Sequence, residues 1–511
     1  MNRLFLLALA ALPLLAQSSQ RSISMADLRD RIRGGWAGQM FGVSYGAPTE
    51  FRYNEVIIPV DKLPKWSPEK VDNSLNQDDL YVDMTFAQVL DEKGLNATTE
   101  DFGAMFKDSK YALWHANLAA RRALRRGVPA TLSGTPKYNV HANDIDFQIE
   151  ADFIGLMTPG LPQAANDIAW RAGRVMNYGD GIYGGMFVGC MYAAAFFESD
   201  PHRVVEAGLQ CIPAKSPYGQ LIADLLVWHK QDPRNWETAW QQIEKKWNRR
   251  EPCPAGAMRP FNIDAKINGA YIALGLLYGD ADMTKTIEIS TRAGQDSDCN
   301  PSSAAGVLGT MLGWNKIPDQ WKSGIPPLAD RKFAYTNQTF NTIVDSTVKR
   351  AVAVVQKAGG RVDGEKLIIP FQAPKAAKLE LWDDYGSPAE NIEVTDARWK
   401  FTGAWASNDK AAPRITDEKN AVAEISFEGT GFIAVGPYLS NGGFAEAWLD
   451  GRKIGNVDVC SDEKANKGGE SVFHQFHLKP GKHTVRLVVL GVKHDDSAGA
   501  KVGLSGLLVF R

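Results

Sequence analysis

The hydrophobic pattern of the chain changes once, near residue 378, and this change limits the folds that the chain can adopt. Over residues 24–358, apolar residues recur at intervals of three and four, which is typical of helices. Later runs such as 421–427 alternate apolar and polar residues, and turn sequences such as Asp450-Gly451 and Pro480-Gly481 separate them as in β-hairpins. The sequence therefore predicts a multi-domain protein, with an all-α domain at 24–358, a linker at 359–377 and an all-β sandwich at 378–511.

The N-terminal part carries one long apolar run, Leu4 to Leu15, which follows Arg3. A run of about a dozen residues is too short to span a bilayer and fits the core of a signal peptide at residues 1–18. We therefore expect an exported protein, periplasmic or secreted, with no membrane partner. The five cysteines are scattered and odd in number, so they predict no disulfide framework, although one or two bridges fit an oxidising compartment.

The charge balance argues against a nucleic-acid partner. The chain has 57 Lys and Arg residues against 59 Asp and Glu residues, a formal net charge of −2. It therefore lacks the electrostatic footprint of a nucleic-acid-binding protein. The one dense basic cluster (Arg121, Arg122, Arg125 and Arg126) is interpreted as a solvated helix face. The pattern predicts no particular oligomeric state.

A glycine stripe marks the first predicted helix. Gly38, Gly42 and Gly46 are spaced by four, so they share one helical face that another helix can approach closely. The same stretch contains Gly42-x-Ser44-x-Gly46, which matches the nucleophile elbow of serine hydrolases. That motif needs a preceding strand, whereas residues 25–33 are typical of a helix, so the pattern does not favour a serine hydrolase.

Two pairs of carboxylates open two further predicted helices. Gln77-Asp78-Asp79 begins one, and Asp296-Ser297-Asp298 precedes the small-residue run 304–309. Neighbouring carboxylates repel one another unless a proton or a cation lies between them, and oxygen donors suit a hard divalent ion. Helix capping, in which the aspartates accept backbone N–H bonds, is the alternative for each pair.

Together, these three motifs resemble the ADP-ribosylglycohydrolase family. The resemblance covers about residues 25–320 and rests on the order of a glycine-rich helix ending in Gly-Ala-Pro-x-Glu-Phe, an Asp-Asp pair and a late Gly-x-Asp-Ser-Asp. It implies an all-α catalytic domain whose central cleft holds two divalent metal ions, usually Mg²⁺ or Mn²⁺. It also implies hydrolysis of a glycosidic bond at an anomeric carbon.

The resemblance assigns roles by position. Glu50 ends the first motif and is expected to act in catalysis, together with Asp79. Gln77 and Cys299 stand where the family usually has hydroxyl ligands; the Gln77 amide oxygen can coordinate, whereas a thiol is a poor ligand for a hard cation. The expected ligands of two divalent ions, Mg²⁺ or Mn²⁺ with Ca²⁺ as a further option, are Gln77, Asp78, Asp79, Asp296, Asp298 and Cys299.

Other segments depart from the family where a substrate would be held. The acid-rich segment 144–152 is unfavourable for a pyrophosphate and suits a neutral, hydroxyl-rich sugar, with surface positions as the alternative for its acids. Residues 177–180 stand where many members have a Thr-His segment that faces the substrate. The predicted substrate-binding residues are Asp146, Glu150, Asp152, Asn177, Tyr178 and Asp180.

The β domain resembles the jelly-roll modules that are appended to secreted carbohydrate-active enzymes. Its aromatic residues Trp399, Trp405 and Tyr438 either stack on sugar rings or belong to the core. The resemblance therefore favours a carbohydrate-binding module.

We thus expect an exported, metal-dependent glycosidase that acts on a glycan or glycoside. One alternative is a true ADP-ribosyl hydrolase, acting on a modified protein or a small molecule. Another is a non-catalytic carbohydrate-binding protein, in which Gln77 and Cys299 mark a decayed site. Export favours the glycosidase, because protein ADP-ribosylation is mainly intracellular.

Overall fold

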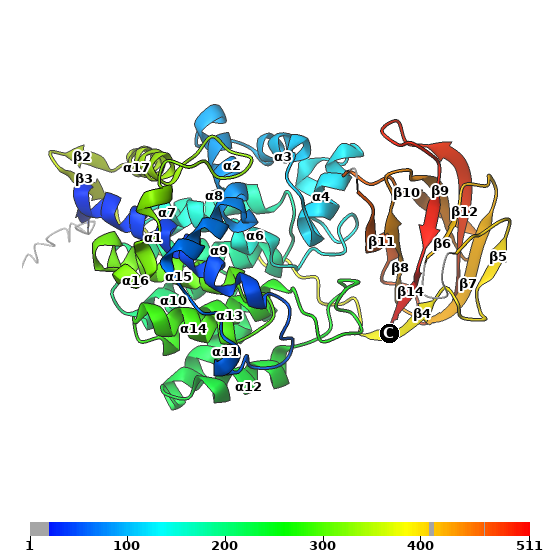
Figure 1. Ribbon diagram of the computed structural model, residues 1–511, viewed down its shortest axis with the longest axis horizontal. Coiled ribbons are helices and arrows are strands. Elements are labelled where there is room, and N and C mark those ends of the chain that lie inside the picture. The colour runs from blue at the N-terminus through cyan, green and yellow to red at the C-terminus, as the bar shows by residue number, and fades with distance from the viewer. Residues whose placement is uncertain (1–19, 408–412, 464) are drawn as a thin grey trace, which may run out of the picture.

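Two bodies follow one another along the chain, a helical one and a β-sandwich, as the change of pattern predicts (Figure 1). The computed structural model describes residues 20–407, 413–463 and 465–511. The signal peptide predicted at 1–18 lies outside these residues. Among the described helices, none combines the length and the apolar character needed to cross a bilayer.

The helical body is built around helices that are buried along nearly their whole length. The helices of the described residues are α1 (Met25–Gly46), α2 (Asp78–Lys93), α3 (Thr99–Asp108), α4 (His115–Arg125), α5 (Ala130–Ser133), α6 (Asp146–Ile149), α7 (Asp152–Leu156), α8 (Pro162–Gly173), α9 (Asp180–Ala195), α10 (Pro201–Gln210), α11 (Pro217–Gln231), α12 (Trp236–Trp247), α13 (Ala265–Tyr278), α14 (Met283–Arg292), α15 (Cys299–Leu312), α16 (Asp319–Lys322) and α17 (Phe340–Lys357). Helices α9, α13 and α15 are buried on almost every side and form the centre. Their small residues let the other helices pack closely around them.

Helix α1 packs against α15 along the glycine stripe, so the predicted close approach is confirmed. A Cβ added at Gly42 would lie 2.3 Å from the carbonyl oxygen of Pro301. One added at Gly46 would lie 2.0 Å from that of Ser297, just before α15. Contacts that advance along α1 move backward along the other segment, so the two helices are antiparallel.

Ser44 lies inside α1, so the nucleophile-elbow pattern has no strand before it. Its Oγ donates a hydrogen bond to the Met40 carbonyl at 2.8 Å, within the same helix. The hydroxyl therefore serves the helix backbone, and the serine-hydrolase alternative fails on geometry.

Replacing Gly42 with alanine should destabilise the protein by about 1–3 kcal/mol, because the methyl group would overlap the backbone of α15. Gly189→Ala in α9 is the matched control, since the nearest atom to its added Cβ lies 3.8 Å away. Alanine at this control position should stabilise the protein by about 0.5–1 kcal/mol. Urea unfolding of both variants measures the difference, and equal stabilities would contradict the packing of α1 on α15.

Two antiparallel sheets face each other in the C-terminal body and form a sandwich (Figure 1). The strands of the described residues are β1 (Arg21–Ser24), β2 (Arg361–Asp363), β3 (Lys366–Ile369), β4 (Pro388–Glu393), β5 (Lys400–Thr402), β6 (Arg414–Thr416), β7 (Val422–Gly429), β8 (Gly431–Tyr438), β9 (Gly443–Leu449), β10 (Arg452–Asp458), β11 (Lys467–Gln475), β12 (Gly481–Lys493), β13 (Val502–Leu504) and β14 (Gly506–Phe510). One sheet has the order β10-β9-β12-β7-β5 and the other β11-β8-β14-β4, while β13 pairs with β6.

Of the two hairpins predicted in the sandwich, one forms and the other does not. The alternating run 421–427 lies mainly in β7, where every second residue is buried. Asp450 and Gly451 form the predicted hairpin between β9 and β10, with φ angles of 49° and 76°. The hairpin predicted at Pro480-Gly481 is wrong, because β12 pairs with β7 and β9 while the preceding β11 pairs with β8 in the other sheet. A turn sequence marks where a strand begins but does not select its partner.

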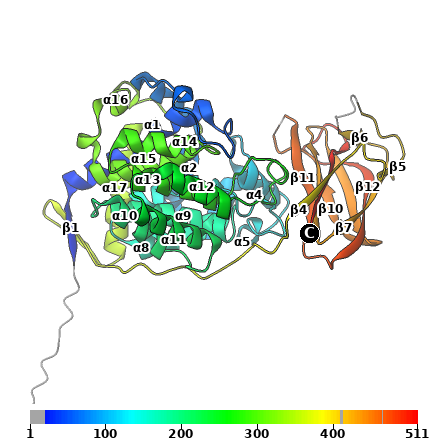
Figure 2. The same ribbon diagram turned by 90° about the horizontal axis from the view of Figure 1, so that it is seen from below.

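The segment expected as a linker, 359–377, begins with a β-hairpin. Its strands β2 and β3 join β1, which precedes α1, in a three-stranded sheet of order β1-β3-β2. The chain then crosses the helical body to reach the sandwich (Figure 2). The Tyr183 hydroxyl donates to the Lys378 carbonyl at 2.7 Å, and the Asn143 amide donates to the Trp382 carbonyl at 2.9 Å. These bonds hold the crossing segment to the helical body.

The arginine cluster of α4 contacts the sandwich, so its interpretation as a solvated face is wrong. The Arg122 guanidinium donates to the carbonyls of Cys460 at 2.6 Å and Asp458 at 2.8 Å. It also lies 3.4 Å from the ring centroid of Tyr438. Arg126 pairs with the Asp458 carboxylate at 2.8 Å. These partners come from a distant part of the chain, so the pattern of α4 alone could not reveal them.

Trp399, Trp405 and Tyr438 are buried, with exposed fractions of 8%, 9% and 8%. They therefore belong to the core and to the contact with α4, and they provide no exposed stacking surface. Of the two roles considered for these aromatic residues, the structure supports the packing role.

Candidate active site

The packing of α1 on α15 places Glu50 beside the loop that leads into α15. After α1, a short 3-10 turn, η1 (Ala47–Thr49), leads directly to Glu50. The Thr49 hydroxyl lies 2.8 Å from the Ser297 hydroxyl, and the Phe51 N–H donates to the Gln295 carbonyl at 2.9 Å. Bonds on both sides of Glu50 therefore fix it against this loop.

The two predicted carboxylate pairs meet in the structure. Asp79 lies in the first turn of α2, and Asp298 is the residue before α15. Cys299 links them, because its thiol donates to Asp79 Oδ2 at 3.4 Å and its N–H donates to Asp298 Oδ1 at 2.9 Å. The ligand atoms of Asp296, Asp298 and Cys299 lie within 4.8 Å of one another. We call Asp78, Asp79, Asp296 and Asp298 the carboxylate cluster.

Members of the carboxylate cluster raise one another's pKa. Burial, and then the negative charges of Asp78, Asp298 and Asp152, raise the pKa of Asp79 well above its ordinary value. Burial and the charge of Asp298 raise the pKa of Asp78 to about 6. The same two causes raise the pKa of Asp296 well above its ordinary value. Carboxylates in such a group hold protons unless a cation neutralises them.

Two oxygens of the cluster indicate what would neutralise it. Oδ1 of Asp79 and Oδ1 of Asp296 are buried and have no hydrogen-bond partner among the described residues. Buried polar atoms normally have partners, so these two call for a further group. Carboxylate oxygens are the donors that hard divalent cations prefer. The residues of the cluster therefore fit divalent metal ions.

Glu50 differs from the aspartates because the residue is exposed to solvent. Its carboxyl end nevertheless lies at the cluster. Partial burial of this end, and then the charges of Asp298 and Asp78, raise its pKa to about 8. Glu50 thus combines access to water with a position beside the carboxylate cluster, which is what proton transfer to or from a water molecule at this site requires.

Gln77 and Cys299, the two departures from the family pattern, occupy different environments. Gln77 is the half-buried residue before α2 and makes no capping hydrogen bond with its side chain. Burial, followed by the neighbouring carboxylates, raises the pKa of the Cys299 thiol well above its ordinary value. The protonated thiol acts as a hydrogen-bond donor to Asp79. Metal coordination by Gln77 and Cys299 stays a prediction.

Glu150 and Asp152 adjoin the carboxylate cluster. Both are 1% exposed, which excludes the surface positions that the sequence allowed. Burial, and then the charges of Asp146, Asp78 and Asp79, raise the pKa of Glu150 well above its ordinary value. Asp152 accepts a hydrogen bond from the Tyr192 hydroxyl at 2.5 Å. These two acids therefore extend the lining of carboxyl groups beyond the cluster.

Asp146 and Asn177 use their polar atoms within the fold. Asp146 accepts the backbone N–H groups of Ala116 at 3.2 Å and Asn117 at 2.9 Å, in the first turn of α4. Asn177 accepts the Phe147 N–H at 3.0 Å and donates to two backbone carbonyls. Both side chains hold loops in place, and their contact with a substrate stays a prediction.

Asp180 and Tyr178 contact residues outside the carboxylate cluster. Asp180 accepts the Tyr218 N–H at 3.2 Å, and the charges that act on it include those of Lys266 and Glu251. Tyr178 packs beside Trp382 and the sandwich, in a separate apolar cluster. The described contacts do not bring either residue to the carboxylate cluster, so their role in substrate binding stays a prediction.

Three tyrosines beside the carboxylate cluster were missed at the level of sequence. The rings of Tyr81, Tyr111 and Tyr335 have centroids 5.1–5.8 Å apart. The charge of Asp78 acts on Tyr81, and Tyr335 is 55% exposed. An aromatic surface that reaches solvent therefore lies next to the acids. Tyr335 comes from the loop before α17, so no local pattern links it to α2.

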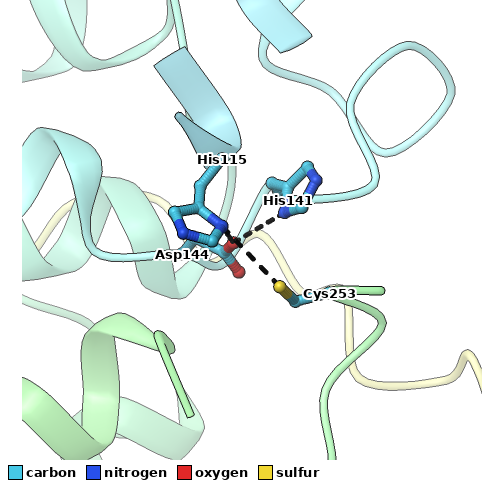
Figure 3. A group of neighbouring side chains, drawn as sticks. All are labelled: His115, His141, Asp144 and Cys253. Atoms are coloured by element: carbon cyan, nitrogen blue, oxygen red, sulfur yellow. Dashed lines mark hydrogen bonds and ion pairs between the residues drawn. The ribbon is translucent and has the colours of Figure 1, made fainter. Parts of the chain in front are cut away.

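A second group of potential ligands was also missed. His115, His141, Asp144 and Cys253 lie together, apart from the carboxylate cluster (Figure 3). They come from separate segments, and His115 and Cys253 are 138 positions apart in the chain. No metal-binding motif has such spacing, so only the fold could reveal this group.

Comparison with known proteins identifies the helical body. The family model described as ADP-ribosylglycohydrolase matches residues 24–353, so the chain belongs to the ADP-ribosylglycohydrolase family. This is a family of metal-dependent hydrolases, which agrees with the donor set of the cluster. Among solved structures, an ADP-ribosylglycohydrolase-related protein complex covers 64% of this chain and 98% of its own, with 14% identity and a TM-score of 0.41.

Two curated proteins of Flavonifractor plautii match shorter stretches. An A type blood N-acetyl-alpha-D-galactosamine deacetylase is 34% identical over 117 residues, which are 22% of this chain and 15% of that protein. An A type blood alpha-D-galactosamine galactosaminidase is 30% identical over 104 residues, which are 19% of this chain and 9% of that protein. The matches thus span less than a sixth of either relative.

Proposed function

We propose that this chain is an exported, metal-dependent glycoside hydrolase that cleaves a glycan or glycoside at an anomeric carbon. The observation that carries the proposal is the carboxylate cluster, in which Asp79 and Asp296 each present a buried oxygen without a partner. Exposed Glu50 lies beside it. An oxygen-donor metal site with an adjacent, water-accessible carboxylate supports hydrolysis better than binding alone.

The roles of the side chains follow from their exposure. Divalent cations held by the cluster would supply Lewis-acid orientation of neighbouring sugar hydroxyls and stabilisation of developing negative charge. Glu50 would accept a proton from the water that attacks the anomeric carbon as positive charge develops on the sugar ring. Asp79 is too deeply buried to meet this water, so its part in catalysis is to hold metal.

Three observations support a carbohydrate substrate. The buried acids Glu150 and Asp152 line the site beside the cluster with carboxyl groups, which are unfavourable neighbours for a pyrophosphate and hydrogen-bonding partners for sugar hydroxyls. The ring of Tyr335, which is 55% exposed and is supported by the buried rings of Tyr81 and Tyr111, offers an aromatic face of the kind on which a sugar stacks. The names of the two short matches, a galactosamine deacetylase and a galactosaminidase, make amino sugars the first substrates to test.

Export is part of the proposal. The apolar run before residue 16 supports it. Cys190 and Cys211 form a disulfide, which persists in oxidising compartments. An exported hydrolase meets glycans more readily than ADP-ribosylated proteins.

A substrate panel tests the proposal. The purified protein should release sugar from at least one α- or β-linked glycoside, with galactosaminides and N-acetylgalactosaminides included. Turnover should vanish after chelation and return with Mg²⁺ or Mn²⁺, with Ca²⁺ as the third ion tested. Binding of glycans without metal-dependent turnover would replace the proposal with a carbohydrate-binding protein.

ADP-ribosyl hydrolysis is the second candidate, because family membership itself favours it. An ADP-ribosylated protein and a small ADP-ribosyl conjugate belong in the same panel. Release of ADP-ribose, with every glycoside left intact, would select this candidate.

A further inference from the structure

Four side chains with nitrogen, sulfur and oxygen donors converge outside the carboxylate cluster (Figure 3). His115 begins α4, His141 and Asp144 lie in the loop before α6, and Cys253 lies in the loop after α12. One ligand atom from each lies within 4.8 Å of every other. The proposed function uses none of them.

The separations between these atoms fit one metal ion. His115 Nδ1 lies 3.7 Å from Asp144 Oδ2 and 3.7 Å from Cys253 Sγ. His141 Nδ1 lies 2.7 Å from the same Asp144 oxygen. Zinc bonds of about 2.0 Å to nitrogen and 2.3 Å to sulfur place tetrahedral ligands about 3.3–3.8 Å apart. The shortest and longest separations therefore need shifts of about 1 Å at most to meet that geometry.

The protein environment favours the ligand forms of the imidazoles. Burial, and then the neighbouring His141, lower the pKa of His115 to about 3. Burial also lowers the pKa of His141. Neutral imidazole is the form that binds a metal. Burial raises the pKa of Cys253 and of Asp144 well above their ordinary values, and the charge of Lys266 offsets this only in part at Asp144, so each group gives up a proton when it binds a metal.

The backbone of His115 is strained in a way that directs its ring into the cluster. Its φ angle is +43°, in the left-handed region that non-glycine residues rarely adopt. The ring stacks against Phe261, with centroids 5.7 Å apart and an interplanar angle of 27°. Such conformations persist where the direction of a side chain matters. In Figure 3 the imidazole faces Asp144 and Cys253.

The cluster borders a cavity of about 400 Å³ between the helical body and the sandwich. His115, His141 and Cys253 line one side, and Glu470 and Ser505 line the other. A metal ion therefore has a path from solvent to three of the four donors, with Asp144 directly behind them.

We propose that His115, His141, Asp144 and Cys253 bind one Zn²⁺ ion, at a site separate from the carboxylate cluster. Two imidazoles, a thiolate and a carboxylate form a donor set that favours zinc over Mg²⁺. The ion joins the start of α4 to the loops before α6 and after α12, and so fixes the wall of the cavity between the two bodies. Binding releases the protons of the Cys253 thiol and of the Asp144 carboxyl to solvent, while His115 and His141 bind through Nδ1 and each keep one ring proton on Nε2.

Metal analysis of the full chain tests this site. The protein, dialysed against zinc and then against metal-free buffer, should retain one zinc ion per chain by mass spectrometry. With Co²⁺ in place of zinc, it should show the ultraviolet thiolate-to-cobalt charge-transfer band and the strong visible bands of a four-coordinate site. Cys253→Ser should abolish the ultraviolet band. It should also weaken zinc binding by more than about 100-fold, because loss of a residue that only supports a ligand already costs up to about that much.

The two remaining free cysteines provide matched controls. Cys299→Ser and Cys460→Ser remove the other buried thiols and should leave the ultraviolet band intact. Loss of the band in Cys299→Ser would place the metal in the carboxylate cluster and overturn the proposal, as would the absence of a retained ion. His115→Ala changes a side chain that is 23% exposed, so it tests the site even if Cys253→Ser fails to fold. It should lose zinc while keeping the far-ultraviolet circular dichroism of the native protein.

Discussion

Glu50→Gln should lower kcat by about 10²–10⁴-fold, the range that a general base contributes, while the protein still folds and binds metal. The amide keeps the size of the side chain but cannot accept the proton of the attacking water. Glu50 is held by bonds of its neighbours Thr49 and Phe51 rather than by its own carboxyl, so the change should leave the loop in place. Turnover of the best glycoside in the panel and metal-dependent thermal shifts measure the two effects.

Glu69→Gln is the control, because Glu69 is an exposed glutamate in a 3-10 segment. It should retain the kcat of the wild type. If Glu50→Gln retained full turnover too, another group would activate the water and the role of Glu50 would be wrong. A loss of metal-induced stabilisation in Glu50→Gln would instead make Glu50 a metal ligand.

Asp79→Asn should have opposite effects on the metal-free and metal-bound protein. Burial and neighbouring carboxylates raise the pKa of Asp79 in the folded protein. Ionisation of Asp79 therefore disfavours the folded state, and the free energy of unfolding decreases as the pH rises toward this pKa. The neutral amide removes this penalty, so the metal-free variant should unfold at a higher temperature than the wild type at neutral pH. The amide oxygen can still accept the Cys299 thiol hydrogen bond.

In the presence of metal, Asp79→Asn should lose the stabilisation that the bound ion gives to the wild type. A ligand at 100 times its Kd stabilises a protein by about 2.7 kcal/mol, and this increment should disappear when Asp79 no longer carries charge. Turnover should fall to that of the chelated wild type. Asp363→Asn, at an exposed strand residue, is the control and should change neither the metal-induced stabilisation nor the turnover. An undiminished Mg²⁺ or Mn²⁺ shift in Asp79→Asn would contradict its role as a ligand.

Local patterns predicted the parts of the site that lie close together in the chain. The four-residue spacing of Gly42 and Gly46 predicted close helix contact, because helix periodicity sets which residues share a face. The Asp78-Asp79 pair and the Asp296-Ser297-Asp298 run indicated oxygen donors by their composition alone. The structure adds the reason that they meet, since the glycine face brings α1, and with it Glu50, against the loop before α15.

Local sequence patterns did not predict the roles of side chains whose partners lie far away in the chain. Arg122 has the spacing of a solvated helix face, yet its guanidinium lies on Tyr438 of the sandwich. Asp146 and Asn177 have the polar character of binding residues, yet their atoms are engaged with backbone groups. In each case the polar character of the side chain is as predicted, but the group that it contacts lies far away in the chain.

By itself, the sequence determined the two fold classes, the helix contact along the glycine stripe and the carboxylates suited to metal, because each is a property of neighbouring residues. Only the tertiary structure decided that Tyr335 lies beside α2 and that His115, His141 and Cys253 lie around Asp144. The physical reason is that burial and packing join segments whose separation in the chain carries no periodic signal. The second group of donors, and the zinc ion that we propose for it, therefore follow from the fold.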